Sequence, residues 1–170
     1  NGTIYRAETV TEFLKTQAAL KENGYELAGF NSSQYDDPVT TMFLTKQGSL
    51  HEAMTLSSQL VSGNAQAWNQ ANDIKSIDLM PLLPGRMSLK QAGIRLGHSK
   101  LQELPIAYDK ILTPTEKDII RAYNDNDLQI TQKLHRHLQG ELDVRRALSN
   151  HYDIDLRSKA GSQIAGLVIG

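Results

Sequence analysis

The strongest constraint on the fold is a helix start that the sequence specifies twice near residue 113. Thr113 is a favourable N-cap, Pro114 suits the first helical position, and Glu116 completes a capping box. The residues that follow recur at steps of three and four and so share one helical face: Ile119, Ile120, Tyr123, Asp127, Ile130 and Leu134. The pattern continues through Leu148, with Gly140 as a kink or break. A long helical segment therefore dominates the C-terminal half.

The rest of the chain alternates strand patterns with helix patterns. We predict strands over residues 3–6, 25–30 and 74–80, of which the second is apolar enough to be buried. Helices are predicted over residues 9–24, 38–46, 49–61 and 89–96, and a last one from residue 158 or 159. Residues 64–72 have no clear pattern. This alternation indicates an α/β fold, with one domain over residues 1–152 and a linker and the start of a following region over residues 153–170.

Composition excludes several classes of protein. The formal charge is −1, so the chain is not a strongly basic protein of the kind that coats nucleic acid. There is no cysteine, which rules out disulfides, thiolate nucleophiles and cysteine-based metal sites. The sequence has no apolar run long enough for a membrane span, and we expect no membrane association. The chain starts without methionine and ends in an apolar helical pattern, so we expect it to be an internal piece of a longer protein.

Two segments carry acids in positions that suit chemistry. In the first, a predicted strand runs into Asn31, then Tyr35 and Asp36, where a helix opens. A carboxylate there could bind a metal ion, or Asp36 could simply cap the helix. In the second, Tyr123 and Asp127 lie four residues apart on one helix face. Asp127 either lies at the solvated edge of the apolar stripe or needs a hydrogen bond, a partner or a cation.

A basic segment lies between these two. Lys90, Arg95 and Lys100, together with His98, concentrate positive charge over residues 88–101 and could contact phosphates. The alternative is an ordinary solvated surface. The five histidines have no ligand spacing, so we expect structural or surface roles for them. No calcium loop and no phosphate-binding glycine motif is complete.

Taken in order, the segments resemble the DEDDy 3′–5′ proofreading exonuclease region of phage-type, family-B-like DNA polymerases. Phe30-Asn31-x3-Tyr35-Asp36 resembles the second exonuclease motif, and Tyr123-x3-Asp127 resembles the third. Residues 74–80 are similar to the intervening central strand, and residues 88–101 to the segment before the third motif. Residues 155–159 resemble the stretch that leads towards the polymerase domain.

The resemblance implies a ribonuclease H-like fold, a mixed sheet flanked by helices. It also implies phosphodiester hydrolysis with two Mg²⁺ or Mn²⁺ ions, in which Asp36 and Asp127 are metal ligands and Tyr123 orients the attacking water. Asn31 would support the second-motif loop or the substrate strand, with Lys90, Arg95 and Lys100 near nucleic acid. The implied partners are a single-stranded DNA 3′ end and the polymerase domain of the same parent chain. The implied location is the cytoplasm of a phage-infected bacterial cell.

One departure from the family pattern changes the expectation for this chain. The first exonuclease motif, Asp-x-Glu on the first strand, occurs nowhere in the sequence. Half of the metal-binding carboxylates are then missing, so we predict little or no nuclease activity from these residues alone. A missing first strand would also leave an exposed sheet edge that invites self-association.

Two other interpretations stay open. The chain could be a non-catalytic ribonuclease H-like module that binds nucleic acid or another partner. It could also be a helical phage protein whose resemblance to the exonuclease is accidental, in which case Asp36 and Asp127 would lie far apart.

Overall fold

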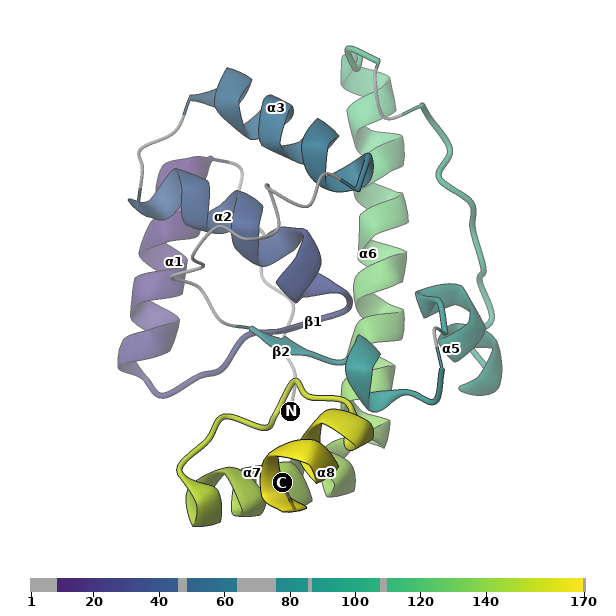
Figure 1. Cartoon of the computed structure of the whole chain (residues 1–170). Helices are drawn as coiled ribbons and strands as arrows, with labels where there is room; N and C mark the ends of the chain where they lie inside the picture. The colour runs from purple at the N-terminus through teal and green to yellow at the C-terminus, as the bar shows by residue number, and fades with distance from the viewer. Residues whose placement is uncertain (1–8, 46–48, 64–75, 86, 108–109, 170) are drawn as a thin grey trace. The chain divides into compact units, whose positions relative to one another are not determined.

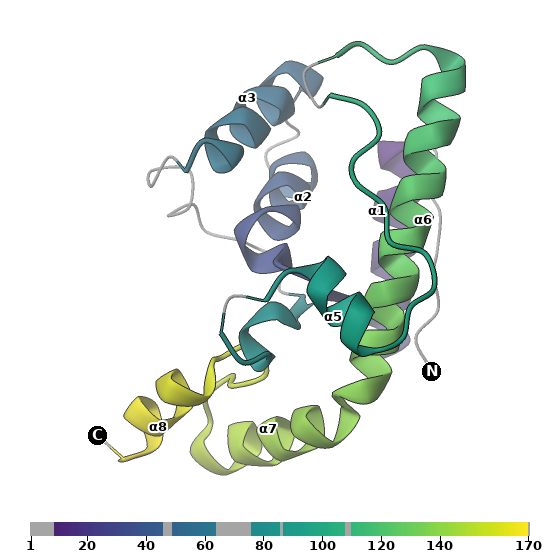
Figure 2. The same cartoon turned by 90° about the vertical axis from the view of Figure 1, so that its right-hand side faces the viewer.

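The computed structural model describes residues 9–45, 49–63, 76–85, 87–107 and 110–169 (Figures 1 and 2). The described residues fall into two compact units: an N-terminal unit over residues 9–79 and a C-terminal unit over residues 80–169. In the described part, helices predominate and the sheet has two parallel strands. The predicted α/β class, rich in helix towards the C-terminus, is therefore confirmed in this coarse form. The strand predicted over residues 3–6 and the unassigned stretch at 64–72 lie outside the described residues.

The N-terminal unit begins with α1, Val10–Glu22, as the sequence predicts. The Thr9 hydroxyl accepts a hydrogen bond from the Glu12 backbone N–H at 3.2 Å, which satisfies one of the free donors of the first turn. The helix ends at Asn23, and Gly24 follows with a φ of +73°, a conformation that glycine adopts without strain.

The two strands are much shorter than predicted. β1 is Ala28–Gly29 and β2 is Ile77–Asp78, paired in parallel, with Ala28 opposite Ile77 (Figure 1). The prediction that residues 25–30 form a buried strand is wrong in extent, since Tyr25 is 63% exposed. Directly after β1, Asn31 turns the chain with a φ of +57°, and the 3-10 helix η1, Ser32–Gln34, follows.

Gly29 has little space around it. A Cβ built at this position would lie 2.6 Å from the Ser32 Cβ, so only glycine allows η1 to fold back so closely on β1. The strand end and the turn after it are thus one tightly packed structure.

Two helices supply the core of the N-terminal unit. α2, Asp36–Thr45, begins two residues before its predicted start because Asp36 and Asp37 form its first turn. α3, Leu50–Val61, begins at the predicted place with a complete Ser49 and Glu52 capping box. The two helices bury an apolar cluster between them, formed by Leu56 and Leu60 with Val39 and Met42.

The C-terminal unit contains one short 3-10 helix and four α-helices. They are η2 (Met80–Leu82), α5 (Leu89–Arg95), α6 (Pro114–His137), α7 (Gln139–Tyr152) and α8 (Gly161–Ile169). The predicted Thr113 capping box is formed, and Ser88 forms a capping box with Gln91 at the start of α5. The predicted break near Gly140 falls two residues earlier, at Leu138, where the Gln139 side chain donates to the His135 carbonyl at 3.0 Å.

Close helix packing sets the position of α5. Gly93 faces α6, and a Cβ there would lie 3.3 Å from two carbon atoms of Ile130. Figures 1 and 2 both show α5 lying against α6, and the two helices share many contacts. The buried apolar residues of this unit are Met87, Ala92, Ile130, Leu134, Leu142 and Leu156. The last of these lies in residues 155–158, which the sequence predicts as a linker.

The segment between α7 and α8 is held down by polar contacts. Arg145 is only 4% exposed; its guanidinium donates to the Lys159 carbonyl and pairs with Glu141. The Ser149 hydroxyl accepts from the Leu156 backbone N–H at 3.0 Å. These bonds fix the chain where it turns from α7 towards α8.

None of the helices in the described ranges has the length and apolar character that crossing a membrane requires.

Candidate functional site

The first group of candidate residues lies on a turn held by a fully buried aspartate. Asp78, at the end of β2, is 0% exposed. Its Oδ1 accepts from the Asn31 backbone N–H at 2.8 Å, and its Oδ2 accepts from the Ser33 backbone N–H at 3.2 Å and the Ser33 hydroxyl at 2.6 Å. This carboxylate takes the donors that the left-handed turn at Asn31 exposes, and it thereby fixes the loop that leads into Asp36.

A second aspartate ties α2 to the start of β2. Asp37 is 5% exposed and its Oδ2 accepts from both the backbone N–H and the hydroxyl of Ser76, each at 3.1 Å. The Ser32 and Ser76 hydroxyl oxygens lie 2.6 Å apart. Since the Ser76 hydroxyl donates to Asp37, the Ser32 hydroxyl is left to donate to Ser76. The result is a polar network under the first turn of α2.

Asp36 is the solvent-exposed member of this group of acids. Desolvation of its carboxyl group and, to a smaller extent, the negative charges of Asp37 and Asp78 together raise its pKa from 3.8 to about 6. A positive charge near Asp36 would favour its ionised form. Tyr35, the aromatic residue of the motif, is directed elsewhere, with its hydroxyl 2.7 Å from the Ser57 hydroxyl of α3.

Asp36→Asn is expected to stabilise the fold at neutral pH. Because the folded-state pKa of Asp36 is raised, the native state binds more protons than the unfolded state between about pH 4 and pH 6, and the free energy of unfolding falls as pH rises through that window. The amide removes this loss. The gain should be about 1 kcal/mol or less, since solvent screens an exposed carboxylate.

Denaturant unfolding of both proteins at about pH 4 and about pH 7.5 measures the effect, with the exposed Glu22→Gln as control. The stabilisation should be present at the higher pH and absent at the lower one. Equal stability of Asp36→Asn and the unchanged chain at both pH values would contradict the electrostatic account.

A second group of candidate residues lies on α6, in the C-terminal unit. Tyr123 and Asp127 lie one helical turn apart on this helix, as their spacing predicts. Burial raises the pKa of the Tyr123 phenol, and the nearby charge of Asp127 raises it further, so the phenol stays protonated and can donate to a carboxylate. Burial also raises the pKa of Asp127, against the lowering effects of Tyr123, Lys90 and His98.

Asp127 is half-buried, and Tyr123, Lys90 and His98 are near enough to lower its pKa, which favours the interpretation of an acid with neighbours over that of a fully solvated one. Its neighbour Asn126 is more deeply buried, at 5% exposed, and the Asn126 Oδ1 lies 3.0 Å from the His98 Nε2, from which it can accept a hydrogen bond. Ile119, placed on the apolar face by its spacing, is 45% exposed.

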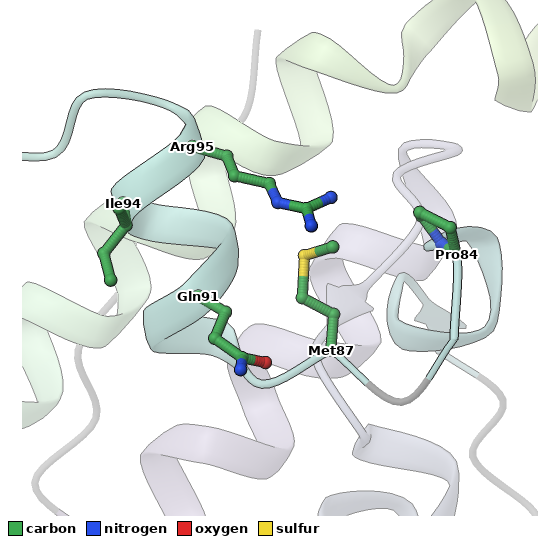
Figure 3. A pocket seen from close by; sticks show the side chains of 5 residues that line it. All are labelled: Pro84, Met87, Gln91, Ile94 and Arg95. Carbon is green, nitrogen blue, oxygen red and sulfur yellow. The ribbon is translucent and has the colours of Figure 1, made fainter.

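The basic residues predicted to contact nucleic acid lie on α5 and just after it. Lys90 pairs with Glu103, whose side chain is 91% exposed. Arg95 lines an open depression of about 320 Å³, and Figure 3 shows its guanidinium and the Met87 thioether converging there, with Pro84 on the other side. Lys100 is exposed in the following segment. Asp36, Asn31 and the acids near them belong to the other unit.

Each unit offers a carboxylate whose oxygen atoms suit a hard divalent cation, Asp36 in the N-terminal unit and Asp127 in the C-terminal unit. The number of donors is smaller than a closed site needs: within the described ranges, no three acidic or histidine side chains are grouped so as to hold a metal ion. Further ligands would have to complete such a site.

Sequence reasoning missed three residues in these surroundings and gave a fourth another role. Asp37 and Asp78 support the Asp36 loop, Asn126 precedes Asp127, and His98, predicted only as part of the basic segment, lies beside Asn126. For Asp78 a signal existed, because an acid between Ile77 and Leu79 in a predicted strand needs buried partners. For the other three, the partner is distant in sequence and nothing local identifies it.

No protein-family model, no curated protein and no solved structure matches this chain.

Proposed function

We propose that this chain is part of a 3′–5′ proofreading exonuclease region of a DNA polymerase, with a ribonuclease H-like fold. The observation that carries the proposal is that Tyr123 and Asp127 lie one helical turn apart on α6, with Asp127 half-buried. This is the spacing of the third exonuclease motif that the sequence resembles. The pair also has a basic neighbour in Lys90, which suits a phosphodiester substrate.

The N-terminal unit supports the same proposal independently. Its second-motif residues lie on a loop that a fully buried carboxylate holds in place, and the loop ends at an exposed acid whose pKa is raised to about 6. Perturbed acids of this kind cluster at functional sites, although structural networks also produce them. The parallel pairing of β1 with β2 is compatible with the proposed mixed sheet.

In this proposal each of the candidate site residues has a definite role. Asp36 and Asp127 hold Mg²⁺ or Mn²⁺, and Tyr123 orients the attacking water through its phenol. A bound metal would supply an activated water and stabilisation of the leaving oxygen. Asn31 supports the loop or the substrate strand. Lys90, Arg95 and Lys100 contact the phosphates of a single-stranded DNA 3′ end, and the polymerase domain of the parent chain is the partner.

The absence of an Asp-x-Glu motif limits what these residues do alone. With two carboxylates in place of four, a divalent ion would be held weakly, and we expect little or no hydrolysis. We also expect the sheet to have an open edge through which copies can associate. Both expectations apply to these 170 residues by themselves and not to the proposed parent enzyme.

A single-stranded oligonucleotide with a fluorescent 5′ end tests the proposal. We expect no shortening in Mn²⁺, but binding that is tighter with Ca²⁺ than with a chelator. Asp36→Asn and Asp127→Asn should each weaken the Ca²⁺-supported binding several-fold, and a 3′-phosphate on the oligonucleotide should do the same. Asp118→Asn, an exposed aspartate on α6, is the matched control and should bind like the unchanged chain.

Two results would overturn parts of this proposal. Hydrolysis that Asp127→Ala abolishes would show that these residues form a working nuclease by themselves. Equal binding by Asp36→Asn, Asp127→Asn and the unchanged chain would remove the metal-binding role of both acids.

A second candidate is a non-catalytic nucleic-acid-binding or interaction module of the same fold, favoured by the missing Asp-x-Glu. It predicts binding that falls with salt, is equal with Ca²⁺ and with a chelator, and does not depend on a free 3′ end.

A further inference from the structure

The open depression beside α5 combines an apolar floor with a positive charge. It is lined by Pro84, Met87, Gln91, Ile94 and Arg95. Met87 is only 7% exposed and forms the floor, whereas Ile94 is 60% exposed. In Figure 3 the Arg95 guanidinium is directed towards the Met87 thioether, and Pro84 lies on the opposite side. The depression therefore presents an apolar surface and a cation to solvent at the same place.

The packing of α5 on α6 leaves this face open and holds it in place. Ala92 is 2% exposed, and a Cβ at Gly93 would lie 3.3 Å from two carbon atoms of Ile130 on α6. The three lining residues that α5 supplies are three and four positions apart, so they share the opposite face of the helix. Because the buried face is held against α6, the open face is carried on a fixed backbone, and little order has to be gained when a ligand binds.

The polar groups of the depression are donors. Within the part of the chain that the structure describes, the Arg95 guanidinium has no ion pair or hydrogen bond. The Gln91 Oε1 already accepts from the Ser88 backbone N–H at 2.9 Å, so the Gln91 amide has its NH₂ group left to donate. A guanidinium binds a carboxylate or a phosphate with two parallel hydrogen bonds. A fitting ligand therefore carries an anion next to an apolar group.

The size and lining of the depression favour a protein segment over other anions. Pockets that enclose a small molecule measure about 300–1,000 Å³ and bury most of its surface, whereas this depression is open and measures about 320 Å³. Single-stranded nucleic acid is held by aromatic rings along a basic groove, and no aromatic ring of the described residues lines this depression. Methionine and arginine are instead enriched where proteins bind one another.

We propose that this depression docks a segment of a protein partner, which places an apolar side chain on Met87 and an aspartate or glutamate carboxylate on the Arg95 guanidinium. The apolar contact supplies most of the affinity, while the exposed ion pair supplies orientation and selectivity. The inference goes beyond the proposed function, which gives Arg95 a phosphate contact, and it does not depend on metal binding by Asp36 or Asp127.

The methionine methyl groups report binding in the unchanged chain. The sequence has four methionines, so NMR of the ¹³C-labelled methyl groups gives few resonances, and Met87→Leu identifies that of Met87. The peptide acetyl-Leu-Glu-Leu-amide should shift the Met87 resonance. It should bind several-fold more tightly than acetyl-Leu-Gln-Leu-amide, which has the same shape without the charge. Met54, 62% exposed in the other unit, is the internal control, because non-specific adhesion of an apolar peptide would shift it as well.

Variants at the surface of the depression provide the second test. Arg95→Gln should weaken binding of the glutamate peptide several-fold and leave that of the glutamine peptide unchanged, because the protein and peptide changes remove the same ion pair. Ile94→Ala should weaken binding of both peptides. Arg136→Gln changes an exposed arginine on α6 and is the matched control, which should bind both peptides like the unchanged chain.

Three outcomes would overturn this proposal. Thymidine 5′-monophosphate, used as a third probe, would assign the depression to a nucleotide if it shifted the Met87 resonance at lower concentration than the glutamate peptide. Equal binding of the two peptides would remove the role of the Arg95 charge. A Met87 resonance that no probe moves would make the depression an ordinary solvated surface. Failure of the proposed function would look different, since oligonucleotide binding would ignore Asp127→Asn while the glutamate peptide still bound.

Discussion

Asp78→Ala is expected to destabilise the N-terminal unit by about 3 kcal/mol or more, since each buried donor left without an acceptor costs about 1–3 kcal/mol. The change removes the acceptor of two backbone N–H groups and one hydroxyl, all in the turn at Asn31 and Ser33. Asp78 is fully buried, so water reaches these donors only if the turn opens. Against a total stability of about 5–15 kcal/mol for a domain, this is a large fraction.

Denaturant unfolding measures the loss, and hydrogen exchange locates it. Exchange should accelerate first at residues 31–35, because these lose their anchor directly. Asp78→Asn keeps one oxygen acceptor and should fall between the unchanged chain and Asp78→Ala. The control is Glu22→Ala, which removes an exposed acid from α1 of the same unit. If Asp78→Ala unfolded at the same denaturant concentration as this control, the anchoring role of Asp78 would be wrong.

Arg145→Met should destabilise the C-terminal unit by about 2 kcal/mol, the range for a hydrogen bond made by a charged group. Methionine retains much of the aliphatic volume but cannot donate to the Lys159 carbonyl or pair with Glu141. Glu141 is half-exposed and can turn to solvent, so the main loss is at the carbonyl and in the turn that buries Leu156. We expect the segment between α7 and α8 to become more open to proteases.

The next residue along the chain is a close control for this prediction. Arg146 also pairs with an acid one turn away, Asp143, but it lies nearer the surface, with its side chain 34% exposed. Arg146→Met should change the free energy of unfolding by less than about 1 kcal/mol. Equal losses for the two variants, or unchanged protease sensitivity at residues 153–160 in Arg145→Met, would contradict the account.

The sequence predicted the helix starts well because each depends on three or four neighbouring residues. The helices that begin after Ser49, Ser88 and Thr113 start close to the predicted places, and each has a capping box with the partner side chain at the third helical position. The strands were predicted at about the right places but too long. Their length is set by pairing between segments far apart in the chain, and by the turns at Asn31 and Met80, neither of which an alternating pattern reveals.

The candidate site was predicted only in part, for the same reason. Tyr123 and Asp127 could be paired from sequence because a helix places residues four apart together. The support around Asp36 could not, since the acceptor for Asn31 lies 47 residues away and the partner of Asp37 lies 39 residues away. Asn126 was overlooked because the spacing of the apolar residues placed Asp127 on the buried face of α6. In the structure Asn126 is buried and Asp127 is only half-buried.

The parallel ladder between β1 and β2 has a consequence for how the chain tolerates changes in length. Its two strands and the Asp78 anchor close a loop of some 47 residues, and the entropy lost on closing a flexible loop grows only with the logarithm of its length. Doubling such a loop costs only about 0.6 kcal/mol more. Insertions in the connection between α3 and β2 should therefore leave the Asn31 turn intact, while one extra methyl group at Gly29 would disturb it.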